Sequence, residues 1–335
     1  MATIRKRGDY QWQVVVRKAG FDPVYATFDT KKEAEIWAME TELSMEKKRY
    51  IDKKSVPTLH DALVRYLSEV TIHKAPYTQH GERTKAVVIQ RSSLARKRLD
   101  EITPAVLNTW TADLATHQKK SGNTIRLYLA LISHTYTVAA SSWGLDSLKN
   151  PVQAARASTP KAGRGRDRRL REDSGECGLL MAALPYPYDH MAALALETAM
   201  RRTEIHGLTW DAINLKKRSI FLPKTKNGEP RTIPLSPGAL DILTMLGPQE
   251  KGHLWQMVTA DAVSHMFSKH VKAAGLEDFH FHDLRHEAVS RFFENTDLDA
   301  MEIARISGHK TWSQLSRYSH LRTDRLADRL AGKKR

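Results

Sequence analysis

Residues 279–294 read FHFHDLRHEAVSRFFE, and in this stretch an alternating apolar and polar run turns into a helical pattern. Three histidines, His280, His282 and His286, lie within a few positions of Arg285. His282 and Arg285 are three positions apart, so they share one face at the start of a helix. The free backbone N–H groups and the dipole at a helix start favour an anion. The stretch therefore predicts a helix whose first turn can bind an anion.

These residues alone leave three interpretations open. In the first, Arg285 binds a phosphate, because a guanidinium fork matches two phosphate oxygens and cannot ligate a metal. In the second, His280, His282 and His286 ligate a metal ion, although two of them fall on the strand-like run and one comes a turn later. In the third, they are ordinary polar residues of a helix start. We favour phosphate over metal.

A hairpin is predicted upstream of this stretch. Two short β-type runs, RSIFLP and RTIPLS, flank the segment KTKNGEP. Asn227-Gly228 between two such runs is the strongest local hairpin signal. Lys226 stands beside this turn and is a second candidate functional residue.

Two further polar signals occur in the same half of the chain. In AMRRTEIHGLTW, Arg201 follows an apolar helical run and Glu204 comes one turn later. In ISGHKTWSQLSRYSH, His309 precedes Tyr318 by nine positions. Taken alone, Glu204 is interpreted nearly as well as a helix-surface acid as in an orienting role. For Tyr318 alone, an aromatic residue on an amphipathic helix is the preferred interpretation. The signals in chain order are more specific than any one of them.

The composition favours a polyanionic partner. The 335 residues include 53 Lys and Arg against 38 Asp and Glu, a formal net charge of +15. An excess of this size favours a polyanion through counterion release, and charge alone leaves DNA, RNA and an anionic membrane surface open. The single cysteine, Cys177, excludes intrachain disulfides and any zinc site built from several cysteines, which fits a reducing cytosol.

The hydropathy pattern predicts neither a membrane span nor a signal peptide. No apolar run reaches the length of about 18 residues that a spanning helix needs. The first residues, MATIRKRGDY, lack the apolar segment of a signal peptide. We therefore expect a soluble protein of the bacterial cytoplasm that associates with the nucleoid.

We expect a mainly α-helical fold with small β elements, in three domains with one linker. Residues 1–54 alternate polar with aromatic or β-branched residues and then turn helical, which predicts a three-stranded sheet plus one helix. Residues 56–155 predict an all-helical domain of four or five helices, and residues 172–335 an α-rich domain that carries the hairpin. Capping residues mark three of the helix starts: Thr58, Thr103 and Ser121.

Two basic segments are candidates for phosphate contacts. In residues 1–54 the alternative is a solvated basic surface, and the candidates are Arg5, Lys6, Arg7, Arg17 and Lys18. Residues 156–171 interleave basic residues with Pro and Gly, which predicts a linker that could also lie along a phosphate backbone. Its candidate contacts are Lys161, Arg164, Arg166, Arg168 and Arg169.

In chain order, the polar signals resemble the catalytic residues of the tyrosine recombinase family, which includes the phage integrases. Arg201 in AMRRTE is similar to the family's first arginine, and Lys226 in TKNGEPR to its hairpin lysine. His282 and Arg285 in HDLRH resemble its H-x-x-R pair.

The resemblance continues at the end of the chain. His309 in SGH resembles the histidine of the family's L-G-H motif, and Tyr318 in RYSH resembles its nucleophile. Ser307 stands where the family usually has leucine, and we expect this position to pack. More weakly, the helical region resembles the family's core-binding domain and the N-terminal sheet its arm-binding domain. Several motifs, GRDRRL among them, resemble shufflon-type DNA invertases.

This resemblance implies DNA cutting and rejoining without a metal, ATP or any other cofactor. Tyr318 would attack the scissile phosphate to give a 3′-phosphotyrosine and a free 5′-hydroxyl. Arg201 and Arg285 would bind the non-bridging oxygens, with His309 as a further hydrogen-bond donor.

Proton transfer is implied for two more residues. Lys226 would protonate the leaving 5′-oxygen, and His282 would accept the proton of the tyrosine. Glu204 would orient its neighbours. Three other histidines receive no chemical role: His280, His286 and His320.

The leading hypothesis is a prophage or mobile-element integrase that acts as a homo-tetramer on the core and arm sites of double-stranded DNA, with accessory DNA-bending proteins as further partners. Integration is favoured over inversion because the N-terminal sheet resembles an arm-site binder, and because the chain ends soon after Tyr318, without the long extension of the shufflon invertases. The alternatives are an invertase, a non-catalytic DNA-binding regulator and a relaxing topoisomerase.

Overall fold

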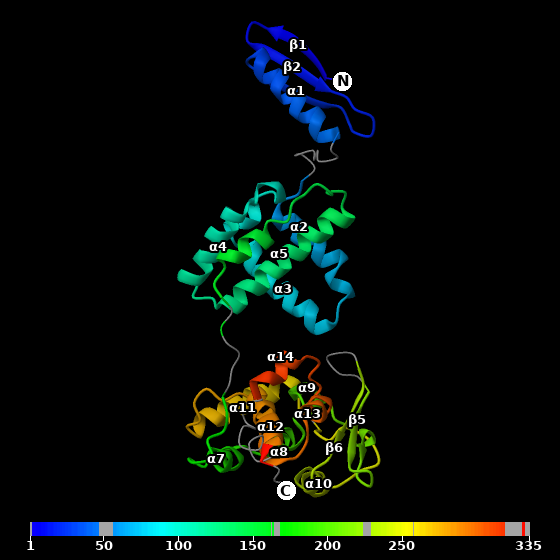
Figure 1. The fold of residues 1–335 in the computed structure, drawn as a ribbon, viewed down its shortest axis with the longest axis vertical. Coiled ribbons are helices and arrows are strands. Elements are labelled where there is room, and N and C mark those ends of the chain that lie inside the picture. The colour runs from blue at the N-terminus through cyan, green and yellow to red at the C-terminus, as the bar shows by residue number, and fades with distance from the viewer. Residues whose placement is uncertain are drawn as a thin grey trace. The chain divides into compact units, whose positions relative to one another are not determined.

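The computed structural model describes residues 2–46, 56–161, 163, 168–223, 229–256, 258–318 and 330–331. The chain divides into two units, residues 1–164 and 165–335, and each is described by itself (Figure 1). The division falls within the segment expected to be a linker. Across the described ranges, no helix combines the length and the apolar character that a membrane span requires.

The N-terminal segment forms the three-stranded sheet and helix that the sequence predicts. Its elements are β1 (Ala2–Gly8), β2 (Gln11–Val16), β3 (Val24–Phe28) and α1 (Lys31–Glu46). β2 pairs antiparallel with both β1 and β3. Val14 and Val16 of β2 are fully buried in one apolar cluster with Ala34 of α1. One face of the sheet and one face of the helix therefore build this small core.

The rest of the first unit is helical, as expected. Its α-helices are α2 (Leu59–Glu69), α3 (Pro76–Gln90), α4 (Pro104–Thr116), α5 (Gly122–Ser142) and α6 (Val152–Ala155). Short 3-10 turns join them at η2 (Thr71–His73), η3 (Ser93–Arg96), η4 (Leu99–Glu101) and η5 (Arg156–Ser158). Each predicted capping residue accepts a hydrogen bond from the backbone N–H three positions later, which satisfies a free donor of the first turn: Thr58, Thr103 and Ser121.

The second unit is α-rich and contains one small sheet. Its helices are α7 (Glu176–Ala183), α8 (Tyr188–Thr198), α9 (Arg202–His206), η6 (Trp210–Ala212), α10 (Pro237–Met245), α11 (Ala260–Ala273), α12 (Phe281–Asn295), α13 (Ala300–Ser307) and α14 (Trp312–Leu315). Its strands are β4 (Ile213–Asn214), β5 (Ser219–Leu222) and β6 (Arg231–Pro234). β5 and β6 pair antiparallel, as the hairpin prediction requires.

Helix α12 joins the parts of this unit that carry the candidate site. It packs against α8 and α13, and α13 also packs against β6. Phe281 and Leu284 of α12 belong to the main apolar core, whereas Phe293 belongs to a second apolar cluster that also contains Ile303 and Tyr318. In Figure 1, α8, α9, α12 and α13 lie at the centre of the unit, and β5 and β6 lie along one side.

The structure differs from the sequence analysis at the end of the predicted linker. Arg168 donates to both carboxylate oxygens of Glu176 at 2.8 Å. Arg169 donates to Glu294 at 2.6 Å and 2.8 Å and also pairs with Glu287. These two arginines are therefore anchored to the C-terminal unit. The carboxylates of Glu287 and Glu294 come from α12, far away in sequence, so the local composition gave no sign of them.

Candidate active site

Arg201 lies between helices α8 and α9, and hydrogen bonds to Glu204 and Gly308 fix its guanidinium. Helix α8 ends where Ala199 adopts a left-handed conformation, with φ of 51°, and Arg201 is the N-cap of α9. Glu204 accepts hydrogen bonds from the backbone N–H and from Nη1 of Arg201, both at 2.8 Å. Arg201 Nη2 donates to the carbonyl oxygen of Gly308 at 3.2 Å. The guanidinium of Arg201 is thus fixed next to the end of α13.

Glu204 connects Arg201 to a second arginine, Arg231 of β6. Nη1 and Nη2 of Arg231 donate to the two carboxylate oxygens of Glu204 at 2.9 Å and 2.8 Å, a bidentate pair. Burial opposes the charge on Glu204, but the hydrogen bonds from Arg231 and Arg201 outweigh it and lower the pKa of Glu204. One carboxylate is therefore shared by two guanidinium groups, and this leaves positive charge for an anion.

Arg285 is the most deeply buried cation of this cluster, with 4% of its surface exposed. Its Nη1 donates to the carbonyl oxygen of Ala199 at 2.5 Å, and its Nη2 lies 3.4 Å from Nε2 of His309. Burial, followed by repulsion from Arg201 and Arg231, lowers the pKa of Arg285 to about 9. Arg285 stays charged at neutral pH, and a buried cation beside two others favours an anionic ligand.

Gly308 brings His309 to this cluster. It closes α13 with φ of 73°, a conformation that favours glycine, and a Cβ there would meet Nη1 of Arg231 at 2.9 Å. Nδ1 of His309 lies 2.7 Å from the hydroxyl oxygen of Ser307. Burial, together with the charges of Arg285 and Arg201, lowers the pKa of His309 to about 3, so the ring is neutral in the unbound protein.

Tyr318 is buried, with 2% of its surface exposed. Its hydroxyl forms a short hydrogen bond with Nδ1 of His286, the residue that follows Arg285. Its ring stacks on Phe293, with centroids 6.0 Å apart and planes at 14°. The guanidinium of Arg317 lies 5.6 Å from the ring centroid, within cation–π range. In this state Tyr318 is held beneath the surface by its hydroxyl and its ring.

The other two histidines of the opening stretch lie at the exposed start of α12. His280 is the N-cap of the helix, and its Nδ1 lies 3.7 Å from Asp283. His282 is exposed and packs edge-on against the ring of His286, with centroids 5.0 Å apart. Burial, with the charges of His282 and Arg317, lowers the pKa of His286 to about 4. Among the described residues, these histidines and their neighbours form no cluster suited to a metal ion.

Several predicted residues lie outside the described part of the chain. They are Lys226, Arg164, Arg166 and His320, together with most of the tail after Tyr318. The hairpin strands on both sides of residues 224–228 are described, and they confirm the antiparallel pairing but not the position of Lys226.

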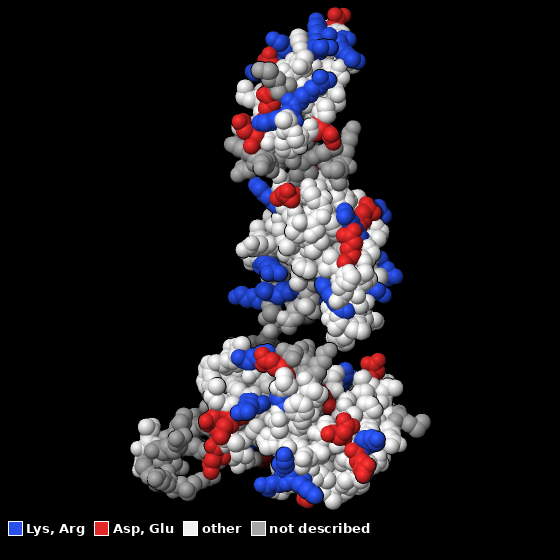
Figure 2. All heavy atoms as spheres, turned by 90° about the vertical axis from the view of Figure 1, so that its right-hand side faces the viewer, with Lys and Arg blue, Asp and Glu red and all other residues white. Residues whose placement is uncertain are grey.

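The predicted DNA contacts fall into two groups. Most of those that the structure describes are solvent-exposed or half-buried: Arg5, Lys6, Arg7, Arg17, Lys18 and Lys161. Figure 2 shows Lys and Arg side chains gathered on the N-terminal part of the chain. In contrast, Arg168 and Arg169 already pair with carboxylates. Their geometry favours a structural role over the phosphate contact that we expected.

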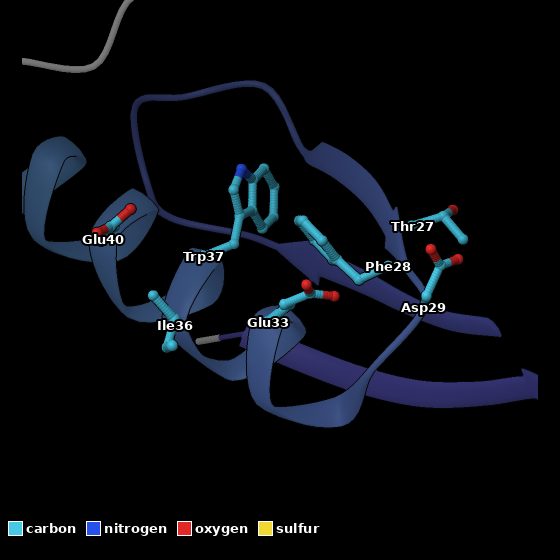
Figure 3. A pocket seen from close by; sticks show the side chains of 7 residues that line it. All are labelled: Thr27, Phe28, Asp29, Glu33, Ile36, Trp37 and Glu40. Atoms are coloured by element: carbon cyan, nitrogen blue, oxygen red, sulfur yellow. The ribbon is translucent and has the colours of Figure 1, made fainter. Parts of the chain in front are cut away.

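A surface pocket of about 390 Å³ lies in the N-terminal segment, between β3 and α1 (Figure 3). Phe28 and Trp37 line it together with three carboxylates: Asp29, Glu33 and Glu40. Carboxylates repel DNA phosphates, and the pocket contains none of the predicted catalytic residues. We therefore place the candidate active site at the arginine cluster.

Three residues to which we assigned no chemical role from the sequence contact the candidate catalytic residues in the structure. Arg231 pairs with Glu204, His286 with Tyr318, and Ser307 with His309. Arg231 lies two positions before the fully buried Ile233 of β6, so strand alternation places both on one face. His286 follows His282 by four positions, which indicates a shared helix face. Ser307 was expected only to pack, but its hydroxyl contacts His309. The spacing of these residues was visible in the sequence, and their side-chain contacts were not.

Comparisons with known proteins identify the family. The phage integrase family model matches residues 173–325. A shufflon-specific DNA recombinase of Escherichia coli is 39% identical over 292 residues, which cover 83% of this chain and 73% of that protein. The integrase of Escherichia phage P2 is 25% identical over 346 residues, covering 98% of this chain and 94% of that protein.

Solved structures show the same fold. The Tn1549 transposon integrase in complex with circular intermediate DNA has a TM-score of 0.66 and 16% identity, covering 83% of this chain and 100% of that chain. A lambda integrase dimer bound to a core site has a TM-score of 0.64 and 20% identity, covering 96% of this chain and 95% of that chain.

The helical fold is that of the solved integrases, and the enzyme class is that of a tyrosine-type site-specific DNA recombinase. The chain belongs to the phage integrase family. The predicted family, fold class and enzyme class are thereby confirmed.

Proposed function

We propose that this recombinase cuts and rejoins double-stranded DNA through a 3′-phosphotyrosine at Tyr318, in the integration and excision of a prophage or mobile element. One observation carries the proposal. Arg201, Arg285 and His309 come from three separate elements, yet hydrogen bonds link each of them to a neighbour in one cluster. The candidate nucleophile, Tyr318, contacts His286, the residue next to Arg285. The same unit therefore contains a nucleophile and the residue types that bind phosphate.

The arginine cluster suits the charge that develops during phosphoryl transfer. As the Tyr318 oxygen bonds to phosphorus and the bond to the 5′-oxygen breaks, negative charge grows on the non-bridging oxygens. Arg201 and Arg285 would stabilise this charge with fixed guanidinium groups, which need little reorganisation. The bond energy stays in the phosphotyrosine ester, so the reverse attack by a 5′-hydroxyl needs no ATP.

Two proton transfers complete the step. Lys226 would donate a proton to the leaving 5′-oxygen, as the family resemblance implies. His282 would accept the tyrosine proton once Tyr318 reaches the phosphate, because this histidine is exposed and packs against His286, the partner of Tyr318 in the unbound protein. In the unbound protein the hydroxyl bonds to His286 instead, so Tyr318 must leave His286 before it attacks.

We propose that the protein acts as a homo-oligomeric assembly on DNA. One solved relative of similar fold is a lambda integrase tetramer bound to a Holliday junction. We extend this arrangement to the present chain as a homo-tetramer on two DNA sites in the bacterial nucleoid. The exposed basic residues of the N-terminal sheet would bind arm sites, and accessory DNA-bending proteins would help to bring arm and core sites together.

The test is trapping of the covalent adduct. Nicked duplexes that carry the repeats flanking the gene should yield a protein–DNA adduct that survives denaturing electrophoresis. Tyr318→Phe should abolish the adduct and leave DNA binding intact, whereas Tyr186→Phe, which removes an exposed hydroxyl in the same unit, should have no effect. Site-specific binding without any adduct would favour a non-catalytic regulator, and relaxation of plasmids that lack the site would favour a topoisomerase.

Inversion is the second candidate, because a curated relative at 39% identity is a shufflon-specific recombinase. Plasmids that carry two sites as direct or as inverted repeats separate the two activities. An integrase should recombine an attachment-site pair on separate molecules. Activity restricted to inverted repeats on one molecule would favour an invertase.

A further inference from the structure

Ser307 is the last residue of α13, and its side chain is completely buried. Its hydroxyl oxygen lies 2.6 Å from the carbonyl oxygen of Ile303, one turn earlier, and 2.7 Å from Nδ1 of His309. A carbonyl oxygen only accepts hydrogen bonds, and a serine hydroxyl has one hydrogen. Ser307 therefore donates its hydrogen to Ile303, and its oxygen is left to accept from His309.

The contact of the other ring nitrogen of His309 shows whether that nitrogen carries a proton. Nη2 of Arg285 lies 3.4 Å from Nε2 of His309. A guanidinium only donates hydrogen bonds, so Nε2 must be the acceptor. Together, the two contacts require the neutral tautomer of His309 that carries its proton on Nδ1 and has a bare Nε2.

We propose that Ser307 is a positioning residue, which fixes His309 in this tautomer so that His309 becomes a donor to a phosphate oxygen only by taking up a proton. The proposal rests on the proposed function, which places the scissile phosphate against Arg201, Arg285 and His309. The proton comes from solvent and binds to Nε2, while the Nδ1 proton stays with Ser307. The imidazolium then donates from Nε2 to a non-bridging oxygen.

The surroundings of His309 fit a proton that arrives with the anion. The charged and titratable groups that face it are Arg285 of α12, Arg201 before α9, Arg231 of β6 and His286 of α12. With these positive charges and burial, the unbound ring is neutral. A phosphate among the arginines would supply negative charge and favour the imidazolium.

The tautomer can be measured without DNA. Histidine-selective ¹⁵N labelling of the full chain, with His309→Gln to assign the signal, distinguishes a protonated from a bare ring nitrogen by its chemical shift. At pH 7 the wild-type protein should show a protonated Nδ1 and a bare Nε2. A protonated Nε2 with a bare Nδ1 would overturn the proposal, whatever the protein does to DNA.

Variants test whether Ser307 causes this state. Ser307→Ala should shift His309 toward the other tautomer or a mixture, and Ser307→Thr, which keeps the hydroxyl, should retain the wild-type pattern. Ser290→Ala, which removes another buried serine hydroxyl in this unit, should leave the His309 signal unchanged. An unchanged tautomer in a folded Ser307→Ala variant would show that Arg285 alone sets it and would overturn the role of Ser307.

Sulfate serves as the anion probe because it remains a dianion across the pH range of the titration. The His309 pKa should rise in sodium sulfate relative to sodium chloride at equal ionic strength. In the adduct assay, Ser307→Ala should be slower by about 3- to 10-fold, the loss of one hydrogen bond, and its pH profile should differ from that of the wild type. A slower Ser307→Ala variant with an unchanged pH profile would indicate a packing role only. No adduct with the wild-type protein, beside the expected tautomer, would reject the proposed function and not the tautomer.

Discussion

The carboxylate of Glu204 binds two of the arginines in the site and balances part of their charge. It accepts hydrogen bonds from Arg201 and Arg231, and it is the acid that balances the cluster to which Arg285 belongs. The sequence placed Glu204 one turn after Arg201 and suggested an orienting role. It did not show Arg231, because strand β6 meets α9 only in the folded chain.

Glu204→Gln tests this role with almost no change in shape. The amide cannot carry the charge that balances the arginines, so we expect the free energy of unfolding to fall by about 1–3 kcal/mol. Adduct formation should slow by about 10-fold or more, because the charge-assisted hydrogen bonds that orient Arg201 are weakened. Urea unfolding and single-turnover cleavage measure the two effects. Glu250→Gln, at an exposed position, is the control, and equal behaviour of the two variants would contradict the role of Glu204.

The two buried histidines predict how stability depends on pH. The pKa values of His286 and His309 are lowered to about 4 and about 3 from an ordinary value of 6.5. Between pH 6.5 and these lowered pKa values, the unfolded chain binds more protons than the folded chain. The free energy of unfolding therefore falls as the pH falls below about 6.5. Each histidine contributes at most about 1.4 kcal/mol per pH unit.

Thermal unfolding between pH 7 and pH 4 checks this prediction. His309→Gln and His286→Gln should each make the dependence on pH shallower, because each removes one titrating group. Ser290→Ala, which changes a buried side chain without removing a titrating group, should leave the slope unchanged. A slope that survives both buried-site substitutions would show that other groups carry the pH dependence.

At the scale of elements, local signals were the ones that could be read from the sequence. Thr58, Thr103 and Ser121 cap their helices because a side-chain oxygen reaches a backbone N–H three residues away, and this depends only on nearby residues. The Asn227-Gly228 signal likewise predicted the pairing of β5 with β6. The helix start at α12 was also foreseen, with His280 as its N-cap instead of part of a strand.

Contacts between distant elements could not be predicted in this way. The hydrogen bond between Tyr318 and His286 joins α12 to the segment after α14, and no spacing in the sequence indicates it. The pairing of Arg169 with α12 is a second example. From the composition of residues 156–171, Arg169 was expected on a phosphate, whereas the fold supplies two carboxylates that satisfy it.

Arg169→Ala separates these two roles. Glu287 is fully buried and keeps Arg291 as a partner, so we expect a loss of about 1–3 kcal/mol in the free energy of unfolding and not the larger cost of an isolated buried charge. The salt dependence of DNA binding should not change. Lys161→Ala, at an exposed position, is the comparison and should leave stability unchanged. A reduced salt dependence in Arg169→Ala without loss of stability would restore its role as a phosphate contact.

At the scale of the whole molecule, the net charge of +15 is the property that composition alone revealed. It indicates a polyanion, and membership of the phage integrase family identifies DNA. The exposed arginines and lysine of β1 are the clearest group for a test: Arg5, Lys6 and Arg7.

Replacing these three residues with alanine should weaken binding to arm-site DNA. Each lost phosphate contact lowers the slope of log binding constant against log salt by about 0.9 units, so the slope should fall by up to about 2.7 units. Titrations at several salt concentrations measure the slope, and circular dichroism confirms that the sheet is folded. An unchanged slope would favour the solvated basic surface.

If Tyr318 is the nucleophile, one covalent bond forms between its phenolic oxygen and the 3′-phosphate of the cut strand. Mass spectrometry of the proteolysed adduct from a nicked duplex identifies the residue and the phosphate that this bond joins. We expect a nucleotide attached through its 3′-phosphate to the peptide that contains Tyr318, and a free 5′-hydroxyl on the released strand. A nucleotide on any other residue, or one joined through a 5′-phosphate, would contradict it.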